Sequence, residues 1–243
     1  MSEGEDCVYG VDGCGDGRWV ACRATRQGPR EFRVFDSVDC LWQEARNAQL
    51  ILVDVPIGMS WQKRQCDVLA KARLSRWNSR VYLVPHRDAL SAEGRSVASA
   101  MNKARAGWGI SAQSWAIRSL ILGVDRFLAA KPEAPGRVRE CHPEICFWAL
   151  CGKNVVKENK QRPEGFQLRR GLLERVMPGI GSQIDDAIPR LRGLAKPDDI
   201  VDAAVAAWTA MAAIVAPDQL RTLPEIPPRD ERGLPMEMVY RLA

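Results

Sequence analysis

A continuous apolar run at residues 49–55, ended by Pro56 and Gly58, constrains the fold of this chain more than any other segment. Its leucines and β-branched residues do not alternate with polar ones, so the run predicts a strand buried on both faces. Such a strand is typical of an α/β fold whose sheet is flanked by helices. Asp54 lies inside the run, and a buried carboxylate is costly unless it is paired or bound to metal. We therefore expect Asp54 to be functional.

The residues before this run predict the rest of a sheet. Ser37 is placed to cap a helix over residues 38–47. Three earlier segments have the apolar clustering or alternation of strands: residues 8–12, 18–24 and 31–35. Together these elements predict a mixed sheet in which the first and fourth strands are central. Asp12 and Asp54 then lie on neighbouring strands, beside a crevice at the strand ends that often binds ligands in α/β proteins.

Two further acids begin an alanine-rich helix predicted from Pro197 to about Val215. Asp199 and Asp202 are three residues apart, so they share a helix face. In one interpretation Asp198 or Asp199 caps the helix and Asp202 is a first-turn acid favoured by the helix dipole. Capping does not explain an acid at the edge of the apolar face, where Asp202 should lie. We expect Asp202 to be functional, and Asp199 fits either interpretation.

Glu140 and Glu144 flank His142 in a segment that predicts a strand over residues 137–141 and a short helix over residues 144–151. Glu140 would end its strand near the same sheet edge as the aspartates. Either glutamate is suited to bind a metal, position a water molecule or form a salt bridge. His142 titrates near neutrality and can assist proton transfer, although a lone histidine is more often a hydrogen-bonded structural residue.

A mainly helical insertion is predicted at about residues 61–130, including a single amphipathic helix over residues 112–130. Residues 61–108 carry ten Lys and Arg against three acids. This excess attracts polyanions, although most charge runs are solvated helix faces. Trp61 and Trp77 are suited to stack on unpaired bases or to belong to the core. Four arginines are the predicted contacts to backbone phosphates: Arg64, Arg73, Arg76 and Arg80.

Two later segments are expected near the surface: residues 152–162, which are polar, and residues 236–240, which are suited to return as an edge strand. With 46% hydrophobic and 27% charged residues, and with no run as long as a membrane span, the composition is that of an ordinary globular protein. The acidic N-terminus lacks an apolar signal core, which predicts a cytoplasmic location. Its eight cysteines are then expected to be reduced and largely buried. A zinc site at Cys141, His142 and Cys146 is a weaker alternative.

Five motifs in combination resemble the domain of unknown function 429 family: Gly10-Val-Asp12-Gly-Cys, Asp54-Val-Pro-Ile-Gly58, Arg64-Gln-Cys-Asp67, Glu140-Cys-His-Pro-Glu144 and Asp198-Asp-Ile-Val-Asp202-Ala. The likeness extends over nearly the whole chain. That family is described as predicted nucleases of the ribonuclease H-like fold, so the resemblance implies this fold. A similarity to the Holliday-junction resolvase branch of the fold implies an acidic cluster of Asp12, Asp54, Asp199 and Asp202, with Glu140 as a further candidate.

These observations predict a metal-dependent nuclease acting on DNA or RNA. Two Mg²⁺ or Mn²⁺ ions held by the four aspartates would activate water and stabilise the leaving oxygen. One alternative is a protein of the same fold that binds nucleic acid without cutting it. A phosphotransferase of the related sugar-kinase and actin superfamily is disfavoured, because the loop at Gly13, Gly15 and Gly17 lacks hydroxyl residues to meet nucleotide phosphates and is better explained as a turn.

Overall fold

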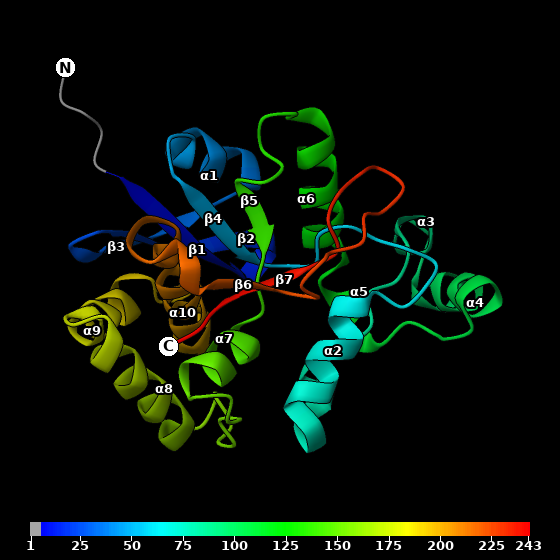
Figure 1. Cartoon of the computed structure of the whole chain (residues 1–243). Helices are drawn as coiled ribbons and strands as arrows, with labels where there is room; N and C mark the ends of the chain where they lie inside the picture. The colour runs from blue at the N-terminus through cyan, green and yellow to red at the C-terminus, as the bar shows by residue number, and fades with distance from the viewer. Residues whose placement is uncertain (1–5) are drawn as a thin grey trace.

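The computed structural model describes residues 6–243, so the predicted acidic N-terminus lies mostly outside the described residues. A mixed sheet has the order β3-β2-β1-β4-β5 (Figure 1). Its strands are β1 (Cys7–Cys14), β2 (Arg18–Thr25), β3 (Gly28–Phe35), β4 (Leu50–Asp54) and β5 (Val138–Glu140). β2 runs antiparallel to both β1 and β3, whereas β4 runs parallel to both β1 and β5. The predicted pairing of the first strand with the fourth is confirmed.

Helices cover both faces of this sheet, as Figure 1 shows. One face packs against α7 (Pro143–Leu150), α8 (Pro163–Val176), α9 (Ile180–Arg190) and α10 (Pro197–Val215). The other face packs against α1 (Val38–Ala45) and α6 (Arg118–Ala130). Ser37 caps α1 as predicted, since its side chain accepts a hydrogen bond from the Cys40 amide at 3.1 Å. The architecture is therefore a five-stranded mixed α/β sheet flanked by helices.

Alternation along the strands decides which side chains face α10. In β4, Leu52 belongs to the core beneath α10, whereas Val53 belongs to the core on the opposite face. Because successive side chains point to opposite faces, Asp54 must project to the α10 side. The same alternation along β1 turns Asp12 to that side, and the sheet register pairs Asp12 directly with Asp54. Asp54 thus ends β4, and Asp12 lies beside it near the end of the neighbouring parallel strand β1, on the same face.

Helix α10 lies in direct contact with the backbone of β1 at Gly10. A Cβ atom added to Gly10 would lie 1.9 Å from the Ala207 nitrogen and 2.3 Å from the Ala203 oxygen. Both neighbours are backbone atoms in a regular helix, so neither moves aside without shifting α10. Glycine on the strand and alanines on the helix therefore permit the close approach that brings the first turns of α10 to the end of β1.

The segment between β4 and β5 carries α2 (Gln65–Leu74), η2 (Ser75–Arg80), α3 (Arg87–Leu90), α4 (Arg95–Ala106) and α5 (Ala112–Ala116), followed by α6. Figure 1 shows α2 to α5 extending to one side of the sheet. The predicted helix over residues 112–130 is two helices, because Ile117 leaves helical geometry with φ −99° and ψ 10°. The second of them, α6, packs on α1 through an edge-on contact between Trp42 and Phe127, with ring centroids 5.7 Å apart.

The chain ends in a small antiparallel pair, β6 (Leu220–Leu223) with β7 (Met238–Arg241), after the short helix η3 (Pro217–Gln219). The C-terminal segment therefore returns as a strand, but its partner is β6, and in the described part of the chain a single bridge, Val239 to Cys141, links it toward the main sheet. The turn after β1 is η1 (Gly15–Gly17). All eight cysteines are free, and most are buried. Within residues 6–243, no helix combines the length and apolar character needed to cross a membrane.

Replacing Gly10 with alanine is expected to lower the free energy of unfolding by about 3 kcal/mol, because the added methyl overlaps the α10 backbone. Gly171→Ala is the matched control. Its Cβ would meet nothing within 4 Å, so alanine should stabilise α8 by about 0.5–1 kcal/mol. Urea unfolding of both variants measures the difference. Equal stability of the Gly10→Ala variant and the wild type would disprove the close contact.

Candidate metal centre

Three aspartates that are distant in sequence meet at the carboxyl ends of β1 and β4. Asp12, Asp54 and Asp202 each offer a carboxylate oxygen, and these oxygens all lie within 4.8 Å of one another. Asp12 and Asp202 are buried, whereas Asp54 is half-buried. Asp202 comes from the second turn of α10, which the contact at Gly10 holds against β1. The convergence expected for these three residues is present.

Burial makes this cluster electrostatically unfavourable when every carboxylate is ionised. It raises the pKa of Asp12 well above the usual aspartate value, and repulsion by Asp54 and Asp202 raises it further. Burial likewise raises the pKa of Asp54 to about 7 and the pKa of Asp202 to about 6, although Lys160 lowers both. At neutral pH the three groups therefore favour either a shared proton or an added cation.

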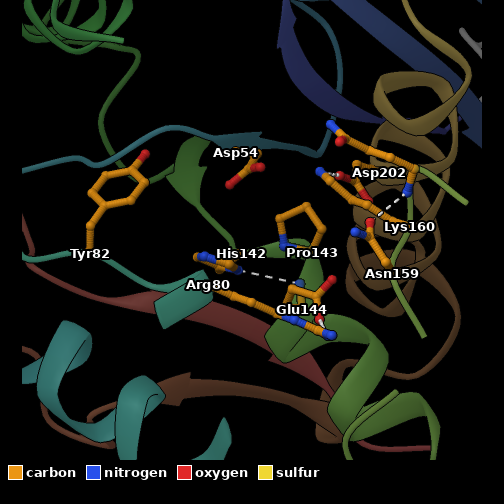
Figure 2. A pocket seen from close by; sticks show the side chains of 10 residues that line it. Asp54, Arg80, Tyr82, His142, Pro143, Glu144, Asn159, Lys160 and Asp202 are labelled. Atoms are coloured by element: carbon orange, nitrogen blue, oxygen red, sulfur yellow. Dashed lines mark hydrogen bonds and ion pairs between the residues drawn. The ribbon is translucent and has the colours of Figure 1, made fainter. Parts of the chain in front are cut away.

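Lys160 supplies part of the positive charge that would balance the three carboxylates. Its ammonium forms an ion pair with Asp202 and lies 4.0 Å from an oxygen of Asp198. Figure 2 shows Lys160 beside Asp202 on one side of Asp54, with Tyr82 on the other side. The polar segment over residues 152–162 is mostly exposed, as predicted, but Lys160 is half-buried within it.

The sequence contained one signal that this segment is anchored to the core. Val155 and Val156 interrupt its polar residues, and Val156 is buried. An apolar anchor of this kind fixes the polar residues that follow it, and Lys160 is among them. Sequence reasoning missed Lys160 because a single lysine in a polar loop carries no periodic signal.

The donor set fits a divalent cation. Mg²⁺ and Mn²⁺ favour carboxylate oxygens, and the cluster offers three carboxylates against one lysine. The Oδ1 atom of Asp202 is buried and has no hydrogen-bond partner among the described residues. A buried oxygen without a partner is unfavourable, and coordination to a cation would satisfy it. Asp12, Asp54 and Asp202 are therefore the residues that fit a metal ion.

Asp199 lies next to this cluster but is engaged in capping. One of its carboxylate oxygens accepts a hydrogen bond from the Lys196 amide at 2.9 Å, which satisfies a free donor at the start of α10. Its charge still contributes to raising the pKa of Asp12. Of the two interpretations of Asp199, the structure supports the cap, and the group of close ligand atoms does not include this residue.

Glu140 and Arg64 form a separate buried ion pair. A guanidinium nitrogen of Arg64 lies 2.6 Å from Glu140 and 3.1 Å from Asp67. The other Glu140 oxygen accepts a hydrogen bond from the Ile57 amide at 2.7 Å. Arg64 is 1% exposed, so its predicted contact to a nucleic-acid phosphate is wrong. Its guanidinium lies against the second group of close ligand atoms found in residues 6–243, namely Cys66, Asp67 and Glu140, and offsets part of their charge.

His142 and Glu144 organise the start of α7. The Nδ1 atom of His142 accepts a hydrogen bond from the Glu144 amide at 3.3 Å, which places the proton of a neutral ring on Nε2. Burial lowers the pKa of His142 and favours that neutral form. Burial alone would raise the pKa of Glu144, but Arg169 and Arg80 bind its carboxylate and hold that pKa below the usual value. The alternative zinc site is not formed, because Cys141, His142 and Cys146 are not among the groups of close ligand atoms in the described chain.

Arg80 is the one predicted phosphate contact that lies at the cavity of the cluster. Its guanidinium binds Glu144 at 2.6 Å and donates to the backbone oxygens of Val156 and Lys157 at 2.7 and 2.8 Å. These bonds use most of its donors on the protein. Arg80 therefore stabilises the loop that positions Lys160 beside the acids.

The remaining predicted nucleic-acid contacts lie outside this cavity. Arg73 stacks over the ring of Trp148 with its guanidinium carbon 5.6 Å from the centroid, and Arg76 stacks over Trp77 at 4.2 Å. Trp61 is half-buried and stacks on His86 at 4.1 Å between ring centroids. The helical segment thus presents arginines paired with tryptophans, away from the acidic cluster.

The acids open onto a cavity of about 390 Å³, shown in Figure 2. Asp54 and Asp202 form part of its wall, with Tyr82, His142 and Lys160 around them. This volume lies at the lower end of the range for small-molecule sites. A ligand in this cavity would lie next to the carboxylates of Asp54 and Asp202.

Replacing Arg64 with alanine should cost about 3–5 kcal/mol of stability, because Asp67 and Glu140 would remain buried without their counter-charge. Arg73→Ala is the control, since it removes a stacked arginine at the surface and should cost about 0.5–1 kcal/mol. Chemical denaturation distinguishes the two. If Arg64→Ala costs no more than Arg73→Ala, the buried pair is not structural.

A pH effect follows from the raised pKa of Asp54, about 7 in the folded protein against roughly 3.9 in an unfolded chain. Between these values the folded protein holds a proton that the unfolded chain has released. The free energy of unfolding therefore falls as pH rises through this window. In EDTA, Asp54→Asn should melt at a higher temperature than wild type at pH 8, with a smaller difference at pH 5. Asp39→Asn, which changes an exposed acid on α1, is the control and should melt as wild type does at both pH values. If Asp54→Asn shows the same dependence of melting temperature on pH as wild type, the raised pKa of Asp54 is refuted.

Comparison with models of protein families identifies one family that matches this chain. The family model described as "Protein of unknown function (DUF429)" matches residues 10–229, a span that includes Asp12, Asp54 and Asp202. Comparisons with curated proteins and with solved structures find no significant match. Because the family match covers most of its 243 residues, the chain belongs to the DUF429 family.

Proposed function

We propose that this protein is a divalent-metal-dependent nuclease that hydrolyses phosphodiester bonds of DNA or RNA on a ribonuclease H-like sheet. The observation that carries the proposal is the convergence of Asp12, Asp54 and Asp202 beside a cavity that Asp54 and Asp202 line, with one buried carboxylate oxygen unpaired. The fold assignment is supported by the parallel pairing of β1 with β4, in which Asp12 and Asp54 lie side by side near the carboxyl ends of both strands.

Asp12, Asp54 and Asp202 are the residues that would hold Mg²⁺ or Mn²⁺, with Asp199 beside them on the first turn of α10. A divalent ion bound there supplies a Lewis acid that activates water and stabilises a leaving oxygen. Burial of the three carboxylates is consistent with this chemistry, because charge interactions strengthen where water is excluded.

The surrounding residues would bind and orient the substrate. Lys160 carries a full positive charge at the boundary between the acids and the cavity, where it can pair with a phosphate oxygen. Arg80 holds the loop of Lys160 through two backbone oxygens, so it acts as a positioning residue. His142 stays neutral and fixes the first turn of α7, which places Glu144 and its partner Arg80 at the cavity. Arg73 and Arg76, with Trp77 nearby, offer charge for a longer polynucleotide.

The test is cleavage of end-labelled single-stranded and double-stranded DNA and RNA with Mg²⁺ or Mn²⁺. Asp54→Asn should reduce the rate to below about one hundredth of wild type, because loss of a metal ligand removes several kcal/mol of transition-state stabilisation. The circular dichroism spectrum should remain that of wild type. Asp39→Asn serves as the control and should retain full activity. Full activity in Asp54→Asn would refute the proposal.

A second candidate function is binding without cleavage. The ion pair between Lys160 and Asp202 favours it, because a lysine that neutralises part of the cluster reduces the need for a metal. A gel-shift assay in EDTA, followed by addition of Mn²⁺, separates the two functions. Bound but intact DNA and RNA across many substrates would favour the binding protein.

A further inference from the structure

We propose that a groove beside the metal centre binds a single-stranded segment of nucleic acid next to the phosphate to be cut. The proposal rests on the proposed nuclease function and extends it by naming the form of the substrate. The groove, here called the α8–α10 groove, has a volume of about 560 Å³ and lies between the loop at residues 160–163, α8, the end of α9 and the start of α10. Its lining includes Arg162, Phe166, Ile188 and Lys196.

The groove is continuous with the cavity of the acidic cluster. Lys160 and Gln161 line both of them. The Lys160 ammonium binds Asp202 on the cluster side, and Gln161 donates to Asp198 at 3.4 Å on the groove side. A chain that places one phosphate at the acids therefore has a direct path past these two residues into the α8–α10 groove.

The charge of the groove is suited to a polyanion. Three of its lining residues are cationic, Lys160, Arg162 and Lys196, against one acid, Asp198. Asp198 is buried and lies within reach of both Lys160 and Gln161, which offset its charge. Arg162 and Lys196 are exposed. Their positive charges are therefore available for the phosphates of a strand that leaves the metal centre.

Apart from Gln161 and Gln167, the remaining lining is apolar, which suits a single strand better than a duplex. Phe166 and Ile188 are half-buried, and Pro163 and Pro197 are exposed beside them. A duplex presents its phosphates and keeps its bases stacked inside, so it has little to offer an apolar wall. An unpaired strand offers base faces and sugars, and an aromatic ring next to cations is the usual platform for them. The mixture of charge and apolar surface therefore favours single-stranded nucleic acid.

The experiment compares two double variants of the full chain. In Arg162→Ala/Lys196→Ala both exposed cations of the groove are removed. The matched control is Arg46→Ala/Lys131→Ala, which removes two cations at the C-terminal ends of α1 and α6, outside the groove. Fluorescence anisotropy in EDTA measures binding to a labelled single strand of roughly 12 nucleotides, a length within the known range of single-strand sites, and to the corresponding duplex.

We expect the groove variant to bind the single strand about tenfold more weakly, with a smaller loss for the duplex. The slope of log affinity against log salt should fall by about 1.4, since each lost phosphate contact on a single strand accounts for about 0.7. The control variant should bind as wild type does. Unchanged single-strand affinity in the groove variant, or an equal loss in the control, would overturn the proposal. A polyglutamate peptide serves as a second polyanion. If the two substitutions weaken its binding but leave the binding of the oligonucleotide unchanged, the proposal is also overturned.

Failure of this inference is distinguishable from failure of the nuclease proposal. If wild type cleaves and the groove variant keeps wild-type affinity and KM, the groove proposal is wrong and the nuclease proposal stands. If wild type cuts nothing with Mg²⁺ or Mn²⁺ but the groove variant loses single-strand binding, the groove proposal stands alone. A Mn²⁺ titration followed by electron paramagnetic resonance should give the same metal affinity for both double variants, because neither changes an acid of the cluster.

Discussion

The contact between α10 and β1 at Gly10 is the constraint on which the candidate site depends. Asp12 is fixed by its strand, and Asp202 is fixed by its helix, so their separation is set by how closely the two backbones approach. Any side chain at Gly10 would overlap Ala203 or Ala207 and push the helix outward. A wider gap would move Asp202 away from the strand ends. The small residues at this contact thus determine the geometry of carboxylates that they do not touch.

Two groups of acids in this protein have different counter-charges. Asp67 and Glu140 share one guanidinium nitrogen of Arg64, which is buried with them. The cluster of Asp12, Asp54 and Asp202 has the single ammonium of Lys160, carried by a loop, and keeps one unpaired oxygen. The first group already holds a fixed cation in contact with Cys66, Asp67 and Glu140. The second retains unfavourable charge that a cation would relieve, which is why we assign function to it.

The sequence predicted the parts of this site that follow from local patterns. The apolar run before Asp54 identified a buried central strand, and the pairing of that strand with the first one followed from the order of elements. The family likeness drawn from five motifs was confirmed by the match over residues 10–229. Lys160 and the burial of Arg64 were missed, because both depend on partners distant in the chain; Arg64 and Glu140 are separated by 76 positions. Asp199 could not be assigned from spacing, since a capping acid and a ligand occupy the same place at the start of a helix.

The alternation of side chains in β4 limits which deletions this protein can tolerate during evolution. Deletion of one residue before Asp54 would shift the register of the strand by one residue and turn the carboxylate toward α1 and α6. Loss of a second residue would restore the face but carry the acid about 7 Å along the strand, out of step with Asp12. Neither a single nor a paired deletion is therefore neutral. We therefore expect the lengths of the two central strands to change as rarely during evolution as the acids that they carry.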